Sequence, residues 1–141
     1  MKLSDYQQMP TVAALMKPFR YFARPDDPVA KLFTMMKEHK IRHVPIKQDE
    51  RVVGIVSERD WRWMGSPAIV LPAPEEIPIA HVQVHSPYTV EITTPLNTVV
   101  QEMASRKIGA AVVVKSGQLV GIATVTDICR RFAELLESRF G

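Results

Sequence analysis

Two short polar motifs offer the chemistry in this sequence. Each has a glycine, two apolar residues, a hydroxyl residue and, three positions further on, an aspartate. A hydroxyl and a carboxylate at this spacing can hold a phosphate and a ribose. They do not supply the nucleophile, base and orienting group that an active site needs, so we expect a binding protein rather than an enzyme. The motif residues are Gly54, Ser57 and Asp60 in the first copy and Gly121, Thr124 and Asp127 in the second.

The same residues have a purely structural interpretation. A Ser or Thr followed three residues later by an acid satisfies the free N–H groups at a helix start, and the acid also favours the positive end of the helix dipole. A helix start is equally a ready site for anions, and a glycine before it lets a ligand approach the backbone. One residue pair can cap the empty state and bind in the filled one, so the motifs leave both interpretations open.

The motifs belong to a repeat that spans most of the chain. Shifted by 67 residues, the sequence aligns with itself without a gap, and an internal repeat of this kind predicts two equivalent structural units. Each half has roughly 60 residues, a size that is marginal alone, so we expect the halves to share one core. The predicted organisation is an N-terminal segment (1–10), a first domain (11–64), a Pro-rich linker (65–78) and a second domain (79–141).

The elements predicted in each half follow the order helix, strand, helix, strand, strand, helix. Apolar residues at three- and four-residue spacing predict amphipathic helices after Pro28 and Pro95, with Asp27 as the cap of the first. Polar loops between β-rich runs predict two hairpins, and Pro45 argues for an edge strand. The remaining predicted elements are a helix at 11–16, extended segments at 19–22 and 88–92, and helices at 57–64 and 127–140.

Bulk composition favours a soluble cytoplasmic protein without membrane insertion. The chain has 141 residues, 46% of them hydrophobic, and no apolar run approaches the ~20 residues that cross a bilayer. The N-terminus has no signal-peptide core, and the single Cys129 fits a reducing compartment. A net charge of +3 permits anionic ligands. Nucleic acid is a weaker alternative, because no basic stripe interleaved with aromatic residues is present.

Two other functions find little support. Histidines recur at a four-residue spacing in two places, His39 with His43 and His81 with His85. That spacing can chelate a metal on a helix, but no cysteine or acid cluster completes either pair, so we expect no metal site. A structural dimerisation module without a ligand remains the main alternative, and in it the two hydroxyl–carboxylate pairs would be caps only.

The ordered set of segments resembles a pair of CBS (cystathionine-β-synthase-type) domains arranged as one Bateman module. The resemblance is carried by residues 28–36, 41–46 and 52–60 with their partners 67 residues later, and it covers about 11–136. It implies an α/β chain of the α+β type, with two β-α-β-β-α units packed with pseudo-twofold symmetry around two clefts. Such clefts bind AMP, ADP, ATP or S-adenosylmethionine as regulatory ligands, with no required cofactor. The resemblance further implies a homodimer formed through the helices and a separate regulated enzyme or transporter.

The resemblance also assigns residues to the first cleft by position. Ser57 and Asp60 would hold phosphate and ribose, with Ile55 as an apolar wall. Arg42 and Arg59 would add positive charge near the phosphates. The backbone near the adenine would come from Val84, Ile108, Gly109 and Ala110.

The second cleft would use Thr124 and Asp127, with Ile122 as its wall. The first repeat would contribute Lys17, Ile41, Arg42 and His43.

Two departures from the repeat concern charge. The position equivalent to Arg42 is Gly109, and the position equivalent to Arg59 is Thr126. The second cleft would thus have less positive charge of its own. We therefore expect a charged nucleotide to prefer the first cleft, and loss of Asp60 to cost more affinity than loss of Asp127.

Overall fold

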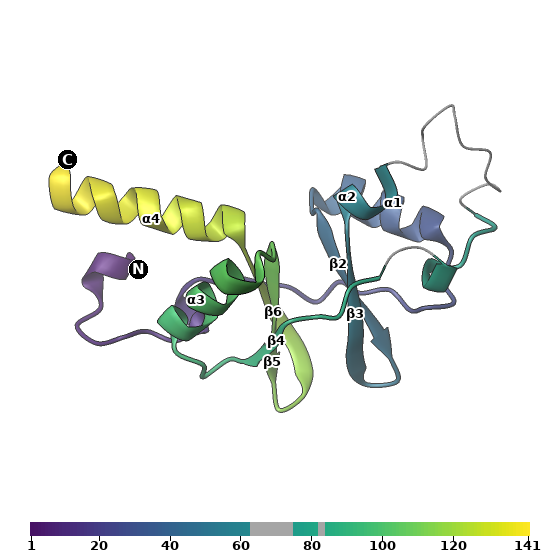
Figure 1. The fold of residues 1–141 in the computed structure, drawn as a ribbon, viewed down its shortest axis with the longest axis horizontal. Helices are drawn as coiled ribbons and strands as arrows, with labels where there is room; N and C mark the ends of the chain where they lie inside the picture. The colour runs from purple at the N-terminus through teal and green to yellow at the C-terminus, as the bar shows by residue number, and fades with distance from the viewer. Residues whose placement is uncertain (63–74, 82–83) are drawn as a thin grey trace. The chain divides into compact units, whose positions relative to one another are not determined.

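The chain divides into two compact units. The computed structural model describes residues 1–62, 75–81 and 84–141, so most of the predicted linker (65–78) lies outside the described residues. The first unit is Tyr21–Pro87, and the second joins Met1–Arg20 to Tyr88–Gly141. Both combine a small sheet with helices (Figure 1), as the predicted α+β class requires.

The first unit is built on a β-hairpin. Strands β2 (His43–Gln48) and β3 (Arg51–Ser57) pair antiparallel, with a register shift after Ile46, and Ala23 bridges to Ile46 in parallel as a third, one-residue strand. The helices are α1 (Val29–His39), α2 (Glu58–Arg62) and the 3₁₀ turn η4 (Ile79–His81). The core includes Val29, Leu32, Val44, Ile46, Val56 and Ile79.

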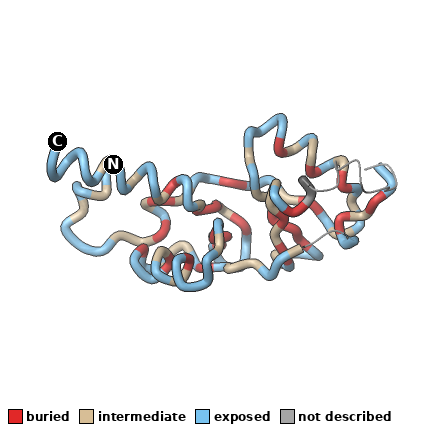
Figure 2. The backbone as a smooth tube through the Cα atoms, turned by 45° about the horizontal axis from the view of Figure 1, so that its top comes forward, coloured by how far each residue is buried: buried red, intermediate tan, exposed pale blue. Residues whose placement is uncertain are grey.

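The second unit has a four-stranded sheet in the order β1-β6-β5-β4. Strand β4 is parallel to β5, and the other neighbours are antiparallel. Buried residues gather on the strands and on one side of α3 (Figure 2). The elements are η1 (Leu3–Asp5), η2 (Val12–Ala14), β1 (Lys17–Pro18), β4 (Thr89–Glu91), α3 (Leu96–Arg106), β5 (Ala110–Lys115), β6 (Gln118–Thr124) and α4 (Val125–Phe140).

Helices α1 and α3 confirm the predicted apolar periodicity. In α1 the buried positions include Val29, Leu32 and Met36, and in α3 they are the residues 67 positions later. The cap of α1 is Pro28 rather than the predicted Asp27. The Asp27 carboxylate instead accepts from the backbone N–H of Arg24 and from Lys31.

The helix predicted over 11–16 is only the single turn η2, because the chain becomes extended at once to pair with β6. Thr11 caps this turn through its side chain.

Each unit contains the leading segment of the other sequence repeat. Residues 11–20 open the first repeat but pair with β6 and with Pro95 in the second unit. Residues 78–87 open the second repeat but pair with Ile55 and Pro28 in the first unit. The predicted domain bounds, 11–64 and 79–141, mark the sequence repeat, whereas the compact units exchange these leading segments.

The motif glycines make room for the exchanged segments. A Cβ on Gly121 would lie 2.5 Å from Sδ of Met16 and 2.8 Å from the carbonyl oxygen of Lys17. A Cβ on Gly54 would meet the side chain of Val84. The sequence interpretation gave these glycines to an approaching ligand; in the structure the approaching group is the chain itself.

Substitution of Gly121 by alanine is therefore expected to lower the free energy of unfolding by about 2 kcal/mol. The added methyl group would overlap the carbonyl oxygen of Lys17 and push strand β1 away from β6. Urea unfolding followed by circular dichroism measures this effect. The double substitution with Met16→Ala removes the sulfur contact and should restore only part of the loss. A change below about 0.5 kcal/mol, the size typical of neutral surface substitutions, would contradict the prediction.

Candidate ligand sites at two helix starts

The second motif forms a complete capping box at the start of α4. Oδ2 of Asp127 accepts from the backbone N–H of Thr124 at 2.9 Å and from its Oγ1 at 2.8 Å. The backbone N–H of Asp127 in turn donates to Oγ1 of Thr124 at 3.3 Å. Only 3% of the Asp127 side chain is exposed. The structural interpretation of this motif is thus confirmed, and one carboxylate oxygen is committed to it.

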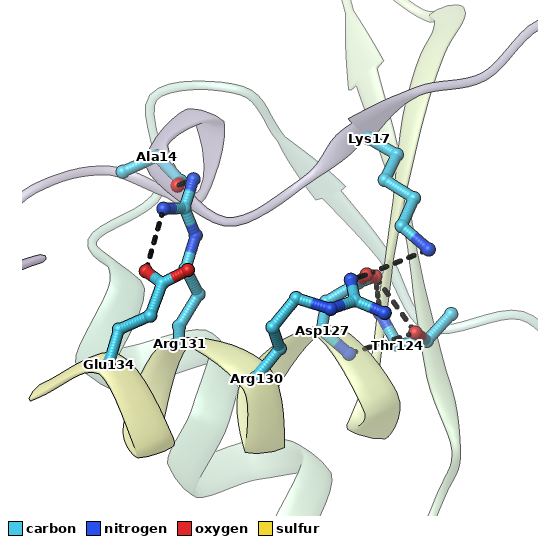
Figure 3. Close-up of polar contacts among 7 residues, drawn as sticks. All are labelled: Ala14, Lys17, Thr124, Asp127, Arg130, Arg131 and Glu134. Carbon is cyan, nitrogen blue, oxygen red and sulfur yellow. Dashed lines mark hydrogen bonds and ion pairs between the residues drawn. The ribbon is translucent and has the colours of Figure 1, made fainter. Parts of the chain in front are cut away.

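The other carboxylate oxygen of Asp127 faces two basic side chains (Figure 3). Nζ of Lys17 on β1 lies 3.0 Å from Oδ1, and Nη1 of Arg130 on α4 lies 3.5 Å from it. A cavity of about 180 Å³ adjoins this cluster. Its lining is Leu15, Met16, Lys17, Asp127, Arg130, Arg131 and Glu134.

A second polar cluster also lines that cavity. Nη1 of Arg131 lies 3.3 Å from Oε2 of Glu134, and Nη2 donates to the carbonyl oxygen of Ala14 at 3.1 Å. This network ties α4 to the turn η2 (Figure 3). The side of α4 that faces its own unit thus carries these polar contacts beside Ile128, which packs against the core.

The first motif repeats the carboxylate geometry at the start of α2. Oδ2 of Asp60 accepts from the backbone N–H of Ser57 at 2.7 Å and from its Oγ at 3.0 Å. Oδ1 of Asp60 lies 2.7 Å from Nε2 of His85. The carboxylate is 7% exposed, while the imidazole is 49% exposed. As in the second motif, one oxygen serves the helix start and the other faces a nitrogen donor.

The nitrogen donors Lys17 and His85 do not occupy equivalent positions of the 67-residue repeat. The equivalent of Lys17 is Val84, and the equivalent of His85 is Pro18. The expectation of less positive charge at the second motif came from positions 109 and 126. In the structure Lys17, which the resemblance assigned to this site, and Arg130 provide two cations around Asp127.

The other predicted site residues divide between the units. Arg42 in the first unit pairs with Glu58 at 3.8 Å, and its carbonyl oxygen accepts from the N–H of Glu58. The carbonyl oxygen of Gly109 accepts equivalently from the N–H of Val125 in the second unit. The first unit also holds Ile41, His43, Ile55, Arg59 and Val84, and the second also holds Ile108, Ala110 and Ile122.

His43 lies on β2 near the first motif. Burial lowers the pKa of His43 below its ordinary value of 6.5; Asp60 opposes this effect, and Arg42 and Arg59 add to it. The folded protein therefore keeps this imidazole neutral at pH values where the unfolded chain protonates it.

Because the unfolded state then binds more protons, the free energy of unfolding should fall as the pH drops below about 7. Urea titrations at pH 7.5, 6.5 and 5.5 test this dependence. The decline should become shallower in His43→Gln, which stays neutral throughout. An identical decline in both proteins would show that His43 does not cause it.

The histidine pairs considered for metal binding serve other contacts. The ring of His39 stacks on Tyr21 with centroids 3.9 Å apart. Among residues 1–62, 75–81 and 84–141 no group of three metal-type ligands occurs. His85 is the functional candidate that the sequence analysis missed. Its pairing register with Ile55 brings it to Asp60, and no local pattern signals that register.

Comparison with known proteins identifies the family. A family model for the CBS domain matches residues 12–62 and 79–134. The chain belongs to the CBS domain family. The predicted family and fold class are thereby confirmed. Each CBS repeat carries its own hydroxyl–carboxylate motif.

Several proteins contain a region that is similar to this CBS domain pair. Inosine-5′-monophosphate dehydrogenase of Staphylococcus aureus is 31% identical over 115 residues, which are 77% of this chain and 21% of that enzyme. The chain thus spans about a fifth of the length of the curated relatives that it matches. The solved structure of AcuB from Vibrio cholerae, a protein provisionally assigned to acetoin utilization, is 28% identical with a TM-score of 0.73. The match covers 94% of this chain and 96% of the AcuB chain.

A third comparison concerns the fold alone. The CBS domain pair of protein MJ0100, solved with 5′-methylthioadenosine and S-adenosyl-L-methionine, is 21% identical with a TM-score of 0.75. The match covers 91% of this chain and 99% of that one. Separately, the described part of the chain has no helix with the length and apolar character to cross a bilayer.

Proposed function

We propose that this CBS domain pair is a regulatory module that binds an adenosine-containing ligand at its two motifs and signals to a separate protein. One observation carries the proposal: both buried carboxylates have the same geometry, with Oδ2 on the helix start and Oδ1 directed toward a nitrogen donor. Oδ1 is the oxygen that can accept from ribose hydroxyls. The binding of adenosine compounds by a protein of the same fold supports this assignment.

The second motif is surrounded by basic and apolar side chains that suit an adenosine ligand. Lys17 and Arg130 provide positive charge for a phosphate, and Leu15 and Met16 add apolar side chains to the lining of the adjoining cavity. Ile122 and the backbone at 108–110 belong to the same unit. We therefore propose that the tighter site lies at Asp127, the reverse of the order expected from sequence.

The first motif has a comparable set of candidate residues. Asp60 and Ser57 would hold the ribose, and Arg59 with Arg42 would favour phosphates. Arg42 would have to leave Glu58 to do so. Ile55 and Val84 remain candidates for the ligand's surroundings, and Ile41 and His43, which the resemblance gave to the second cleft, lie in the same unit.

The partner that we propose for helix α4 is a second copy of the chain. All sixteen residues of α4 are described, and Asp127 is the one buried among them. The side away from its own unit carries an exposed apolar stripe, which we define as Val125, Cys129, Phe132, Leu136 and Phe140. A stripe of this size on a helix marks an interaction surface.

Charge on the edge of the stripe favours self-association. Arg130 and Glu137 are seven residues apart and lie on the same flank of α4. When two copies of a helix pack antiparallel about a twofold axis, the same flanks meet. Arg130 of each copy would then face Glu137 of the other, so the interface is self-complementary. This agrees with the homodimer that the family resemblance implies.

Regulation requires that the ligand bind two states of the module with different affinity. An adenosine ligand that changes the α4 surface of the dimer would alter what a separate enzyme or transporter contacts. The coupling is reciprocal, so that partner would also change the ligand affinity.

Thermal unfolding against a ligand panel tests the proposal. The panel contains AMP, ADP, ATP, S-adenosylmethionine, 5′-methylthioadenosine, NAD and GMP. A ligand at 100 times its Kd stabilises by about 2.7 kcal/mol, which should raise the midpoint by roughly 5–15 °C. A shift confined to adenosine compounds supports the proposal. No shift with any compound, in protein shown to be ligand-free, would make the motifs helix caps and the chain a dimerisation module.

A further inference from the structure

We propose that His85 is a built-in competitor for the ligand at the first site, which it keeps weak by donating to the oxygen of Asp60 that a ribose needs. This inference rests on the proposed adenosine function and deepens it by naming the residue that sets the affinity. It assigns a role to a side chain that the repeat itself does not predict.

The competition concerns one atom. Oδ2 of Asp60 is committed to the backbone N–H and Oγ of Ser57. Oδ1 is held by Nε2 of His85 at 2.7 Å. An ionised carboxylate only accepts hydrogen bonds, so Nε2 is the donor in this contact. A ribose hydroxyl that approached Oδ1 would have to share or replace a short hydrogen bond to a buried charge, and such bonds are among the strong ones.

The backbone fixes the imidazole in this position. The N–H of His85 donates to the carbonyl oxygen of Ile55, and the N–H of Ile55 donates to the carbonyl oxygen of His85, both at 3.0 Å. This reciprocal pair locks the residue in register beside β3. The 49% exposed imidazole would have to change its rotamer to leave Asp60.

The second site differs in the nature of its donor. Lys17 also contacts the free oxygen of its carboxylate, but its side chain is 55% exposed and ends a flexible four-carbon stem. It can turn from Asp127 toward a ligand phosphate while keeping its charge paired. The two sites thus share one carboxylate geometry and differ in the resident donor, which is an imidazole at Asp60 and the flexible side chains of Lys17 and Arg130 at Asp127.

The test measures ligand affinity at the first site alone. Asp127→Asn silences the second site, and isothermal titration with AMP and with adenosine then reports on Asp60. Adding His85→Ala should raise the affinity for both probes about tenfold, because the hydrogen bond from His85 to Oδ1 no longer competes with the ribose. Adding His85→Gln, whose amide can still donate, should change the affinity by less than threefold. Folding of each variant is verified by its thermal unfolding midpoint.

The opposite site provides the matched control. In an Asp60→Asn background, Lys17→Ala should leave adenosine affinity within threefold and lower AMP affinity. An affinity for the first site that falls or stays unchanged in His85→Ala would overturn the inference, since His85 would then be a ligand contact or a bystander. Absence of binding in the wild type and in every variant would instead overturn the proposed function, and the inference with it.

Discussion

Replacement of Asp127 by asparagine should lower the affinity for the adenosine ligand by about 100-fold. The carboxylate would accept from the ribose hydroxyls, and each hydrogen bond to a charged group contributes about 1.5–3 kcal/mol. Asparagine keeps the size of the side chain and one acceptor for the N–H of Thr124, so the cap of α4 should largely persist. Isothermal titration of wild type and variant with the best ligand of the panel measures the change.

Asp60→Asn is the matched variant for that experiment. Its geometry at the helix start is the same, but His85 already occupies its other oxygen. We expect a loss of less than tenfold in the overall affinity, because the weaker site is affected. Equal losses in the two variants would contradict the proposed difference between the sites. A larger loss in Asp60→Asn would instead support the expectation from sequence, in which Arg42 and Arg59 make the first site the tighter one.

The double substitution Phe132→Glu and Leu136→Glu should convert the proposed homodimer to a monomer. Phe132 is 55% exposed, and both residues lie in the centre of the α4 stripe. Full burial of such a side chain contributes about 1.5–3 kcal/mol, and a dimer has two copies of each. Replacing them by acids also places four like charges at the twofold axis. Light scattering coupled to size-exclusion chromatography measures the mass directly.

Met9→Glu is the control for added surface charge. Met9 is an exposed apolar residue of the second unit outside α4, so its replacement should leave the dimer intact. A wild-type protein that is monomeric at 100 µM would contradict the assignment of a second copy to the stripe. A dimer that survives the double substitution would place the interface elsewhere on the chain.

Much of the fold follows from local sequence patterns. The periodic apolar residues of α1 and α3 and the β-rich runs of the two hairpins occur where predicted, because each pattern depends on residues within one element. The hydroxyl–carboxylate motifs cap helix starts for the same reason, since all of their atoms lie within three residues. The repeat predicted two equivalent units, and the family match confirms two CBS domains.

What surrounds the two carboxylates was decided by tertiary structure. The exchanged segments bring Lys17 to Asp127 and His85 to Asp60 across more than 20 residues of chain, and the contacts follow from strand register rather than from the repeat. The same exchange fills the space beside Gly121 that the sequence interpretation assigned to a ligand. The polar contacts on the inner side of α4 likewise depend on where η2 lies. Sequence by itself determined the repeat and the two capped carboxylates, because each motif is encoded by neighbouring residues. Lys17 and His85, and with them much of the difference between the sites, were set by which distant segments the fold pairs.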